Sequence, residues 1–445
     1  MRTEFSLAQL ADPAIAEADK ILRACVHCGF CTATCPTYVL LGDELDSPRG
    51  RIYLIKDMLE ADRPAGPEEA KHIDRCLSCL SCMTTCPSGV HYMHLVDHAR
   101  THIADTYRRP WHDRLLRMLL ARSIPNPRLF RLASAAATLG KPLAPLLARA
   151  GFSRVAAMLR LAPARLLPAP APSGRVFPAE GTRRGRVGLL SGCVQRVLSP
   201  DINAAAFRVL TRHGFDVVLP AGEGCCGSVT HHMGDEDHAL AAARANVTAF
   251  AAELDGDGLD AIVSTASGCG TTMKDYGFML RTDPAFADTA ARVAAKVRDV
   301  SEVLHGLSDV TRAPVPALTV AYQAPCSLQH GQKVVRQPKE VLARLGFTVR
   351  DVPEGHLCCG SAGTYNILQP ELSDRLRDRK IGNLESLAPD VIAAGNIGCI
   401  TQLAGATAIP VVHPVELVDW ATGGPRPAAL AGTGAGGASP RTRPA

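Results

Sequence analysis

Eight of the sixteen cysteines form two runs with the same spacing near the beginning of the chain. The runs are Cys25-x-x-Cys28-x-x-Cys31-x-x-x-Cys35-Pro36 and Cys76-x-x-Cys79-x-x-Cys82-x-x-x-Cys86-Pro87. Three thiolates at this spacing can bind three irons of one cubane, and the fourth, followed by a proline that stops a helix, can reach another cubane. The spacing therefore predicts two [4Fe–4S] clusters that exchange single electrons.

The ligand sets are expected to be crossed, because the fourth cysteine of each run binds the other cluster. We assign one [4Fe–4S] cluster to Cys25, Cys28, Cys31 and Cys86, and the second to Cys76, Cys79, Cys82 and Cys35. Two zinc sites are the alternative, but tetrahedral zinc prefers two CxxC pairs or Cys/His mixtures. Arg23 and Arg75 precede the runs, where they either offset cluster charge or are simply solvated.

The other eight cysteines form two equivalent sets, each with an adjacent pair followed by glycine. They are Cys193, Cys225, Cys226 and Cys269, and Cys326, Cys358, Cys359 and Cys399. In both sets 31 residues separate the first cysteine from the pair. Inert buried thiols are one interpretation. The neighbouring glycines let the backbone approach a bulky group, which favours a metal or redox site holding a further iron–sulfur cluster or zinc.

Predicted strands precede these cysteines in both halves. The first half has strands at 187–190, 215–219 and 261–265 with helices at 199–213 and 236–254; the second has strands at 318–322, 347–352 and 391–394 with helices at 338–345 and 370–387. Each half then ends in a helix, at 300–304 and 415–418. This βαβαβ repetition predicts parallel sheets with right-handed crossovers, and the cysteines should meet at the carboxyl edges of the strands.

The sites divide the chain into six expected segments. They are a leader helix at 1–20, a two-cluster domain at 21–110, a basic helical and Pro/Ala-rich linker at 111–185, repeats at 186–312 and 313–424, and a disordered tail at 425–445. A helical pattern at 51–60 indicates a ferredoxin-like domain of the α-helical kind. The expected fold class is α+β, with this domain followed by a pseudo-duplicated Rossmann-like α/β domain.

Positive charge is concentrated in the linker. Residues 111–186 hold fourteen Arg and Lys against Asp113 and Glu180, a local +12 in a chain of net +5. Amphipathic helices are expected at 114–120 and 143–161. Three interpretations remain: a solvated helical face, a dock for an acidic subunit, or contact with anionic lipid at the membrane where a quinone is found. Few aromatics and no known module argue against nucleic acid.

The amino-acid composition limits the class of protein and the cellular compartment to which it can belong. Apolar residues make up 47 % of the 445 residues and charged residues 20 %, which is typical of a globular protein of several domains. No run approaches the roughly 18 apolar residues of a spanning helix, and the first twenty residues lack the apolar core of a secretory signal. We expect a cytoplasmic protein, or one peripheral on the inner face of the cytoplasmic membrane, whose thiols are metal ligands rather than disulfides.

Histidines and glycine-rich sequence are given lesser roles. Six histidines are expected to be surface residues or to support a site without binding its metal: His27, His72, His91, His231, His232 and His330. His330 is singled out because it follows Cys326 by four positions. Residues 432–437 satisfy GxGxxG, but no strand precedes them. With no other nucleotide-binding loop in the sequence, we expect FAD on partner subunits and not on this chain.

Longer runs of sequence carry a family resemblance. They are residues 21–38, 41–46, 48–56, 265–270 and 356–365. Over about residues 18–422 the chain resembles the iron–sulfur subunits of glycolate oxidase. Its second half resembles the cysteine-rich CCG domain of heterodisulfide reductases, lactate-utilisation proteins and anaerobic glycerol-3-phosphate dehydrogenase. The resemblance implies an iron–sulfur subunit of a multi-subunit glycolate dehydrogenase. FAD-linked oxidase subunits would convert glycolate to glyoxylate, and electrons would pass through both clusters and the CCG domain to a quinone or another acceptor.

One departure from the family pattern affects the second eight cysteines. The CCG motif of heterodisulfide reductases ends in Cys-x-x-Cys, whereas Thr272 and Gln402 occupy the last position here. A cluster with five cysteine ligands is therefore in doubt, and a four-thiolate cluster, a zinc site or a thiol/disulfide pair per half remains. Alternative functions are the iron–sulfur subunit of a lactate or glycerol-3-phosphate dehydrogenase, a disulfide reductase like the heterodisulfide reductases, and a zinc-stabilised scaffold.

Overall fold

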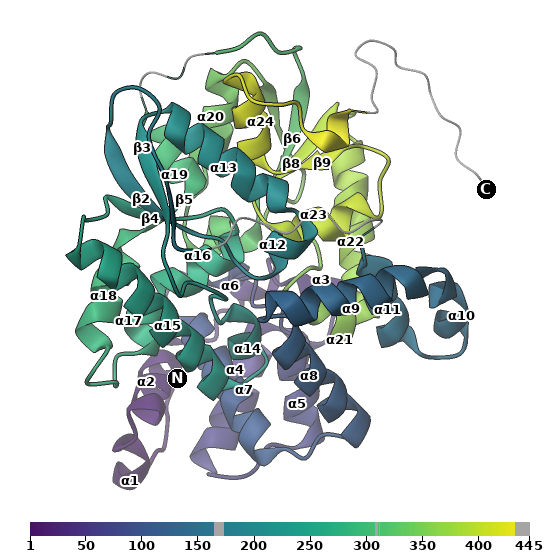
Figure 1. Cartoon of the computed structure of the whole chain (residues 1–445). Helices are drawn as coiled ribbons and strands as arrows, with labels where there is room; N and C mark the ends of the chain where they lie inside the picture. Colours follow the sequence, from purple (N-terminus) through teal and green to yellow (C-terminus); the bar gives the residue numbers. More distant parts are fainter. Residues whose placement is uncertain (164–172, 308–309, 311, 432–445) are drawn as a thin grey trace.

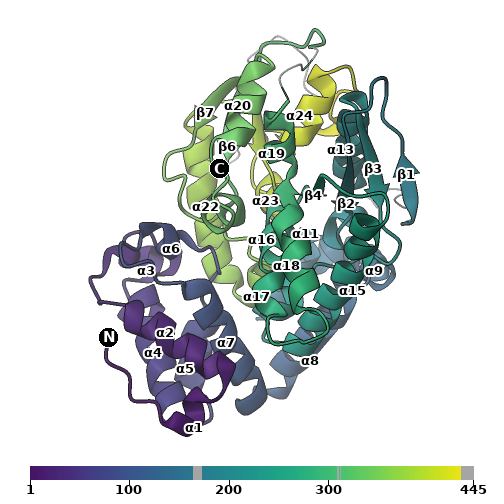
Figure 2. The same ribbon diagram turned by 90° about the vertical axis from the view of Figure 1, so that its left-hand side faces the viewer.

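The computed structural model describes residues 1–163, 173–307, 310 and 312–431. Figures 1 and 2 show a helical N-terminal part packed against a larger C-terminal part that contains the β-sheets, with the helices of residues 111–161 lying alongside both. Among the described residues, no helix combines the length and the apolar character needed to cross a membrane. The helices and strands together give a mixed α and β fold.

Short helices build the N-terminal part. They are α1 (Leu7–Leu10), α2 (Pro13–Ala24), η1 (Phe30–Thr32), α3 (Pro36–Leu41), η2 (Glu44–Asp46), α4 (Pro48–Glu60), α5 (Pro67–Asp74), α6 (Ser81–Thr85) and α7 (Tyr92–Thr106). The expected helix at 51–60 is thus present as α4, which begins earlier because Ser47 caps it by accepting a hydrogen bond from the Gly50 amide. Gly50 is required there, since a Cβ would lie 2.0 Å from the Glu44 carbonyl oxygen.

The expected leader at 1–20 is not a separate element. Helix α2 continues past residue 20 to Ala24, and its Ile21 and Leu22 are buried in one core with Ile55 of α4 and Leu95 of α7. Burial of an apolar helix face is what holds a short helix in place, so α2 belongs to the N-terminal helical core.

The linker is more helical than the sequence suggested. It contains α8 (Trp111–Ser123), α9 (Pro127–Gly140), η3 (Lys141–Leu143), α10 (Ala144–Arg149) and α11 (Ser153–Leu161). Helix α9 was not predicted, and the expected helix at 143–161 is divided at Gly151, which has φ +85°. Buried Asp113 of α8 accepts from Arg117 and from Arg154 of α11, so part of the basic charge is used internally. Residues 164–172 of the Pro/Ala-rich stretch and 432–445 of the expected tail, including the GxGxxG match, lie outside the described residues.

Two β-sheets form the C-terminal part. The first half contains β1 (Arg175–Phe177), β2 (Gly185–Leu190), α12 (Val194–Leu198), α13 (Pro200–Arg212), β3 (Phe215–Leu219), α14 (Ser228–His232), α15 (Glu236–Asp255), β4 (Ala261–Ser264), α16 (Ser267–Lys274), α17 (Tyr276–Met279), α18 (Ala287–Lys296), β5 (Val297–Asp299) and α19 (Val300–His305). The second contains β6 (Thr319–Gln323), η4 (Ser327–Gly331), α20 (Gln337–Arg344), β7 (Thr348–Asp351), α21 (Tyr365–Leu368), α22 (Pro370–Glu385), β8 (Val391–Ala394), α23 (Ile397–Ala404), β9 (Val411–Val412), α24 (Pro414–Ala421) and η5 (Ala428–Leu430).

The two sheets have the same parallel strand order. The first is β1-β3-β2-β4-β5, in which only β1 is antiparallel, and the second is β7-β6-β8-β9. The six strands expected from the sequence are present with ends within two residues of the predicted ones. Strands such as β4 and β8 are buried along their whole length, as parallel strands covered by helices on both faces are.

A single core joins the two sheets. Val187 and Leu189 of β2 lie in the same buried cluster as Val320 of β6 and Ile392 of β8. Helices α13 and α24 contact each other inside this layer, and buried Asp419 of α24 pairs with Arg208 and Arg212 of α13. Shared burial of this extent fixes the two halves against each other, so the carboxyl edges of both sheets have defined positions.

Candidate metal centres

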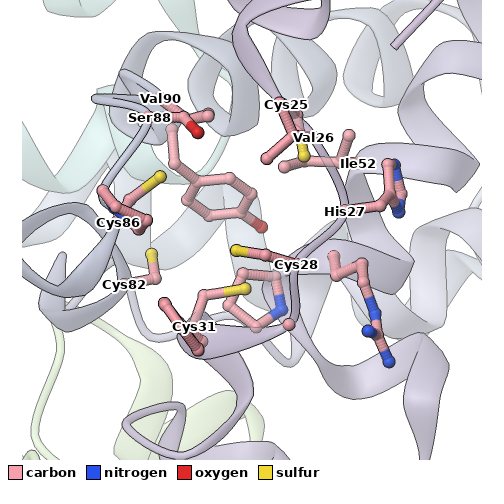
Figure 3. A pocket seen from close by; sticks show the side chains of 16 residues that line it. Cys25, Val26, His27, Cys28, Cys31, Ile52, Cys82, Cys86, Ser88 and Val90 are labelled. Carbon is pink, nitrogen blue, oxygen red and sulfur yellow. The ribbon is translucent and has the colours of Figure 1, made fainter.

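The first cysteine group surrounds one small cavity at the end of α2. Cys25 follows α2 directly, Cys28 and Cys31 lie in the next loop and in η1, and Cys86 follows α6. Their sulfur atoms, together with that of Cys82, point toward one another in Figure 3. Apolar residues such as Pro48, Ile52 and Val90 complete the wall. A convergent set of thiols in an apolar wall is a donor set that suits an iron–sulfur cluster.

The second group occupies an adjacent cavity. Cys35, Cys76, Cys79 and Cys82 line it, so Cys82 borders both cavities. All four are less than a tenth exposed. Burial raises the pKa of the Cys79 and Cys82 thiols well above the usual value, and neighbouring cysteines add to this effect. Buried thiols become stable thiolates when they bind a metal, so this group also fits an iron–sulfur cluster.

The two loops share an unusual backbone. Two and four positions after their first cysteine, both have positive φ: His27 (55°) and Gly29 (82°) in one, Ser78 (47°) and Leu80 (61°) in the other. Three of these residues are not glycine, and such strain persists where the surrounding structure requires it, as at a binding site.

The first of the two fourth cysteines, Cys35, differs from the expectation based on its proline, whereas Cys86 agrees with it. Pro36 is the first residue of α3, with Cys35 as the capping residue, so this proline starts a helix instead of stopping one. Proline suits the first helical position because its missing N–H has no partner there in any helix. Cys86 follows the end of α6, and Pro87 is in the loop beyond it.

A buried ionic network beside Cys35 was missed by the sequence analysis. The Arg51 side chain is 1 % exposed; it donates to the His72 carbonyl oxygen at 2.7 Å and to Asp46 at 3.2 Å. Its Nη1 lies 3.8 Å from the Cys35 sulfur. Asp46 also accepts from Arg75 at 2.7 Å. A guanidinium this close to a thiolate ligand favours added negative charge on the group that the thiolate binds. In the sequence, Arg51 could have been identified only by its place three residues after Pro48, in the run that resembles the family.

Other predicted residues of the N-terminal part have structural partners. Arg23 is exposed and pairs with Asp19. His72 is buried, and its Nδ1 is 3.0 Å from Asp46 in the network beside Cys35. The His27 ring lies beside that of Tyr53, with centroids 4.2 Å apart and the planes tilted by 46°, and His91 lies beside His94 with ring centroids 4.0 Å apart.

The C-terminal cysteines gather where strands end. Cys193 and Cys326 follow β2 and β6, the adjacent pairs follow β3 and β7, and Cys269 and Cys399 lie in α16 and α23 after β4 and β8. The second set is closely spaced: the sulfurs of Cys326 and Cys358 are 3.8 Å apart, and those of Cys359 and Cys399 are 3.4 Å apart.

The first C-terminal set has the same internal contacts. The Cys193 thiol interacts with Cys225 and the Cys269 thiol with Cys226. Donation from Cys193 and Cys226 lowers the pKa of Cys225, and donation from Cys358 and Cys399 lowers that of Cys359. Each set therefore favours one thiolate among neighbouring thiols, a donor set that suits a metal or a redox reaction.

The residues in place of the fifth cysteines do not join these sets. Thr272 donates to the Gly268 carbonyl oxygen at 3.3 Å. Gln402 donates to Ser373 at 2.8 Å and accepts from Asn366 at 3.2 Å. Both side chains are engaged with the surrounding scaffold, so four cysteines per half are left as donors.

The second N-terminal group lies directly against the second C-terminal set. Buried Leu77, Cys79 and Cys358 belong to one apolar cluster, against which Cys326 also packs. Close by, His330 Nδ1 is 2.7 Å from the Thr84 hydroxyl, and His330 Nε2 is 3.3 Å from the His356 carbonyl oxygen. His330 therefore connects η4 to α6. No sequence pattern indicated this contact, because 246 positions separate its two residues.

A histidine-rich contact joins α7 to α14. Asp97 of α7 is buried and lies 3.4 Å from His231 and 3.2 Å from His232. Arg100 also approaches Asp97, at 3.3 Å. These histidines thus hold the N-terminal part against the first half of the C-terminal part and lie outside both cysteine sets.

Family descriptions match most of the chain. A 4Fe-4S dicluster domain matches residues 21–90, and a cysteine-rich domain matches twice, at residues 187–274 and 320–404. The chain is 44 % identical to the glycolate oxidase iron-sulfur subunit of Escherichia coli over 95 % of this chain and 99 % of the relative. It is 32 % identical to the probable glycolate oxidase iron-sulfur subunit of Bacillus subtilis over 91 % and 93 % of the two chains. The resemblance seen in the sequence is confirmed.

More distant relatives share parts or the fold. One of the subunits of a fumarate reductase (CoM/CoB) from Methanothermobacter marburgensis is 30 % identical over 53 % of this chain and 46 % of its own. A crystal structure of a hypothetical protein from Helicobacter pylori is similar with a TM-score of 0.56 at 10 % identity, covering 94 % of this chain and 74 % of that one. The latter likeness concerns the fold alone.

Proposed function

Because the chain belongs to the family of glycolate oxidase iron–sulfur subunits, we propose that it conducts electrons within a multi-subunit glycolate dehydrogenase. Partner subunits with FAD oxidise glycolate to glyoxylate, since that reaction removes two electrons with a hydride and iron–sulfur centres accept electrons singly. The observation that carries the proposal is the apolar cluster that contains Cys79 and Cys358, with Cys326 packed against it, because this cluster brings the N-terminal and C-terminal thiol groups together.

The crossed ligand sets are part of this proposal. One [4Fe–4S] cluster would be held by Cys25, Cys28, Cys31 and Cys86, and the other would be held by Cys35, Cys76, Cys79 and Cys82. Each of these two sets lines a single cavity. The shared border at Cys82 would keep the two clusters near each other, which suits the transfer of single electrons. Cys28 is exposed, so the first group is the one that a partner subunit can approach.

The C-terminal part is proposed to be a duplicated Rossmann-like domain, with repeats at 186–312 and 313–424. Its support is the equal strand order of the two sheets and the double match of the cysteine-rich domain. Each repeat would hold a four-thiolate iron–sulfur cluster or a zinc ion. The second set, in contact with Cys79, would receive electrons first.

The linker helices are proposed to rest on the inner face of the cytoplasmic membrane. Many of the large exposed apolar side chains of the described residues are here: Trp111, Leu115, Leu119, Leu132, Leu139, Leu143, Leu146 and Phe152. Exposed Arg114, Arg122, Arg128 and Arg149 lie among them. Apolar side chains with interspersed positive charge are the arrangement by which helices lie on an anionic lipid surface, where a quinone is available.

Metal analysis of the complex tests the proposal. The chain, co-expressed with its flavoprotein partners and purified without oxygen, should hold about eight irons in its N-terminal part. Glycolate should bleach the visible absorbance of these centres, and lactate serves as the comparison substrate. Fewer than about six irons per chain, or bleaching by lactate but not by glycolate, would contradict the proposal. The variants Cys193→Ser and Cys326→Ser should lower the iron content if the C-terminal sets hold clusters, and the zinc content if they hold zinc.

A further inference from the structure

A cavity of about 260 Å³ lies between the linker helices and both halves of the C-terminal part. Helices α8, α9 and α11 supply one wall, with residues such as Leu120, Phe130 and Ala137. The first half supplies all four of its cysteines, and the second half supplies the opposite side, including Asn366 and Asn396. Figure 1 shows α9 next to α12, and α12 contacts α23; α12 and α23 carry lining residues such as Gln195 and Thr401.

The cavity is lined by the first C-terminal cysteine set and lies one side chain away from the second. Cys193, Cys225, Cys226 and Cys269 are in its wall. Asn396, also in the wall, donates from Nδ2 to the sulfur of Cys399 at 3.8 Å. A molecule bound here would lie beside one set and one side chain away from the other.

The walls select a neutral molecule. Neither Asp, Glu, Lys, Arg nor His occurs among the described residues that line the cavity, and the thiolate favoured at Cys225 repels an anion further. A nucleotide or an anionic disulfide would be left without a counter-charge in this apolar space, which is costly. An apolar cavity of about 150 Å³ holds one benzene molecule, so this larger space accommodates a substituted six-membered ring.

Two amide side chains give the cavity hydrogen-bonding capacity. Gln195 is 3 % exposed, and its Oε1 has no partner among the described residues, while its Nε2 donates to Asn203 and Thr265. An unpaired buried acceptor is unfavourable unless a ligand donates to it. Asn366 uses one amide hydrogen on Gln402 and retains a second one. The wall thus offers both an acceptor and a donor to a ring with oxygen substituents.

We propose that this cavity binds the ring of a quinone, which is the acceptor of the electrons; this inference rests on the proposed function. Glycolate oxidation releases two electrons and two protons. The quinone takes up two electrons from the chain and two protons from water, and its two C=O groups become C–OH groups. Asn366 donates to a quinone carbonyl, and Gln195 accepts from a hydroquinone hydroxyl.

The matched variants Ala137→Trp and Ala136→Trp test the site. Ala137 lines the cavity and is half-buried, whereas its neighbour Ala136 is exposed and does not line it. In the purified complex, binding of decyl-benzoquinone is measured by equilibrium dialysis, and glycolate-dependent reduction of a one-electron dye is measured in parallel. Ala137→Trp should weaken quinone binding at least tenfold, and Ala136→Trp should change neither quinone binding nor dye reduction. Equal binding by the wild type and Ala137→Trp would overturn the proposal.

A second measurement uses the unaltered complex and does not depend on how a variant folds. A photoreactive benzoquinone should label peptides from residues 120–137, 190–198 or 361–367, and labelling confined to other peptides would overturn the proposal. The proposed function fails separately if glycolate reduces neither the dye nor the quinone. Binding and labelling still decide the cavity in that case, because neither readout requires turnover.

Discussion

Replacement of Arg51 by methionine probes the buried network that supports the second cysteine group. The Arg51 guanidinium donates to the His72 carbonyl oxygen, to Thr37 at 3.0 Å and to Asp46 at 3.2 Å, and both charged side chains are at most 1 % exposed. Burial would lower the pKa of Arg51, but the neighbouring cysteines, Tyr92 and Asp46 raise it, so the group stays charged. Methionine fills similar space without the charge.

The expected loss is large because one partner of a buried pair is removed. Such a change costs about 3–5 kcal/mol of folding free energy, since Asp46 keeps a buried charge with less compensation. Arg75, about a quarter exposed, remains bonded to Asp46 and reduces the loss toward the lower end. The double variant Arg51→Met/Asp46→Asn should lose less than the sum of the single changes, because it leaves no uncompensated carboxylate. Loss of a cation 3.8 Å from the Cys35 sulfur should also lower the reduction potential of the cluster proposed to bind there.

The control is Arg49→Met, two positions away on α4. Arg49 pairs with Glu44 at 2.7 Å, but the two side chains are 32 % and 45 % exposed, so this pair contributes only about 0–1 kcal/mol. Anaerobic urea unfolding of the full chain, followed by visible cluster absorbance, gives the midpoints to compare. The reasoning would be refuted if Arg51→Met and Arg49→Met unfolded within about 1 kcal/mol of each other.

Two other predictions concern ligand assignment and pH. Cys86→Ser should alter the same EPR signal as Cys25→Ser, and Cys35→Ser that of Cys76→Ser; if Cys86→Ser follows Cys76→Ser, the crossed sets are wrong. Burial lowers the pKa of His231, but the charge of Asp97 outweighs it and the net pKa is raised above 6.5. The stability that His231 contributes is therefore complete below pH 6.5 and is lost as pH rises through the raised value. Melting temperatures from about pH 6 to 9 should fall more for the wild type than for His231→Gln, while the exposed His238→Gln serves as control and should follow the wild type.

Local sequence pattern was sufficient for much of the fold. The strands that carry the C-terminal cysteines are short apolar runs bounded by turns, and parallel strands buried on both faces have this composition regardless of their partners. Helix α9 was missed, and its position comes from packing against α12. The place of α2 in the N-terminal core could not be read from the sequence, because the burial of its Ala18, Ile21 and Leu22 depends on α4 and α7, which are distant in sequence.

The sequence by itself determined which cysteines act together within each run or repeat, because thiols a few residues apart, or at equivalent strand ends, have fixed local geometry. Only the tertiary structure decided that Cys79 packs with Cys358, that Arg51 is buried beside Cys35, and that a neutral cavity lies between the linker helices and the two cysteine sets. Some of these features come from contacts between segments that are more than a hundred residues apart. The burial of Arg51 depends on which face of its helix, α4, is covered by neighbouring elements. Spacing along the chain carries no information about such contacts, since packing of whole elements sets them.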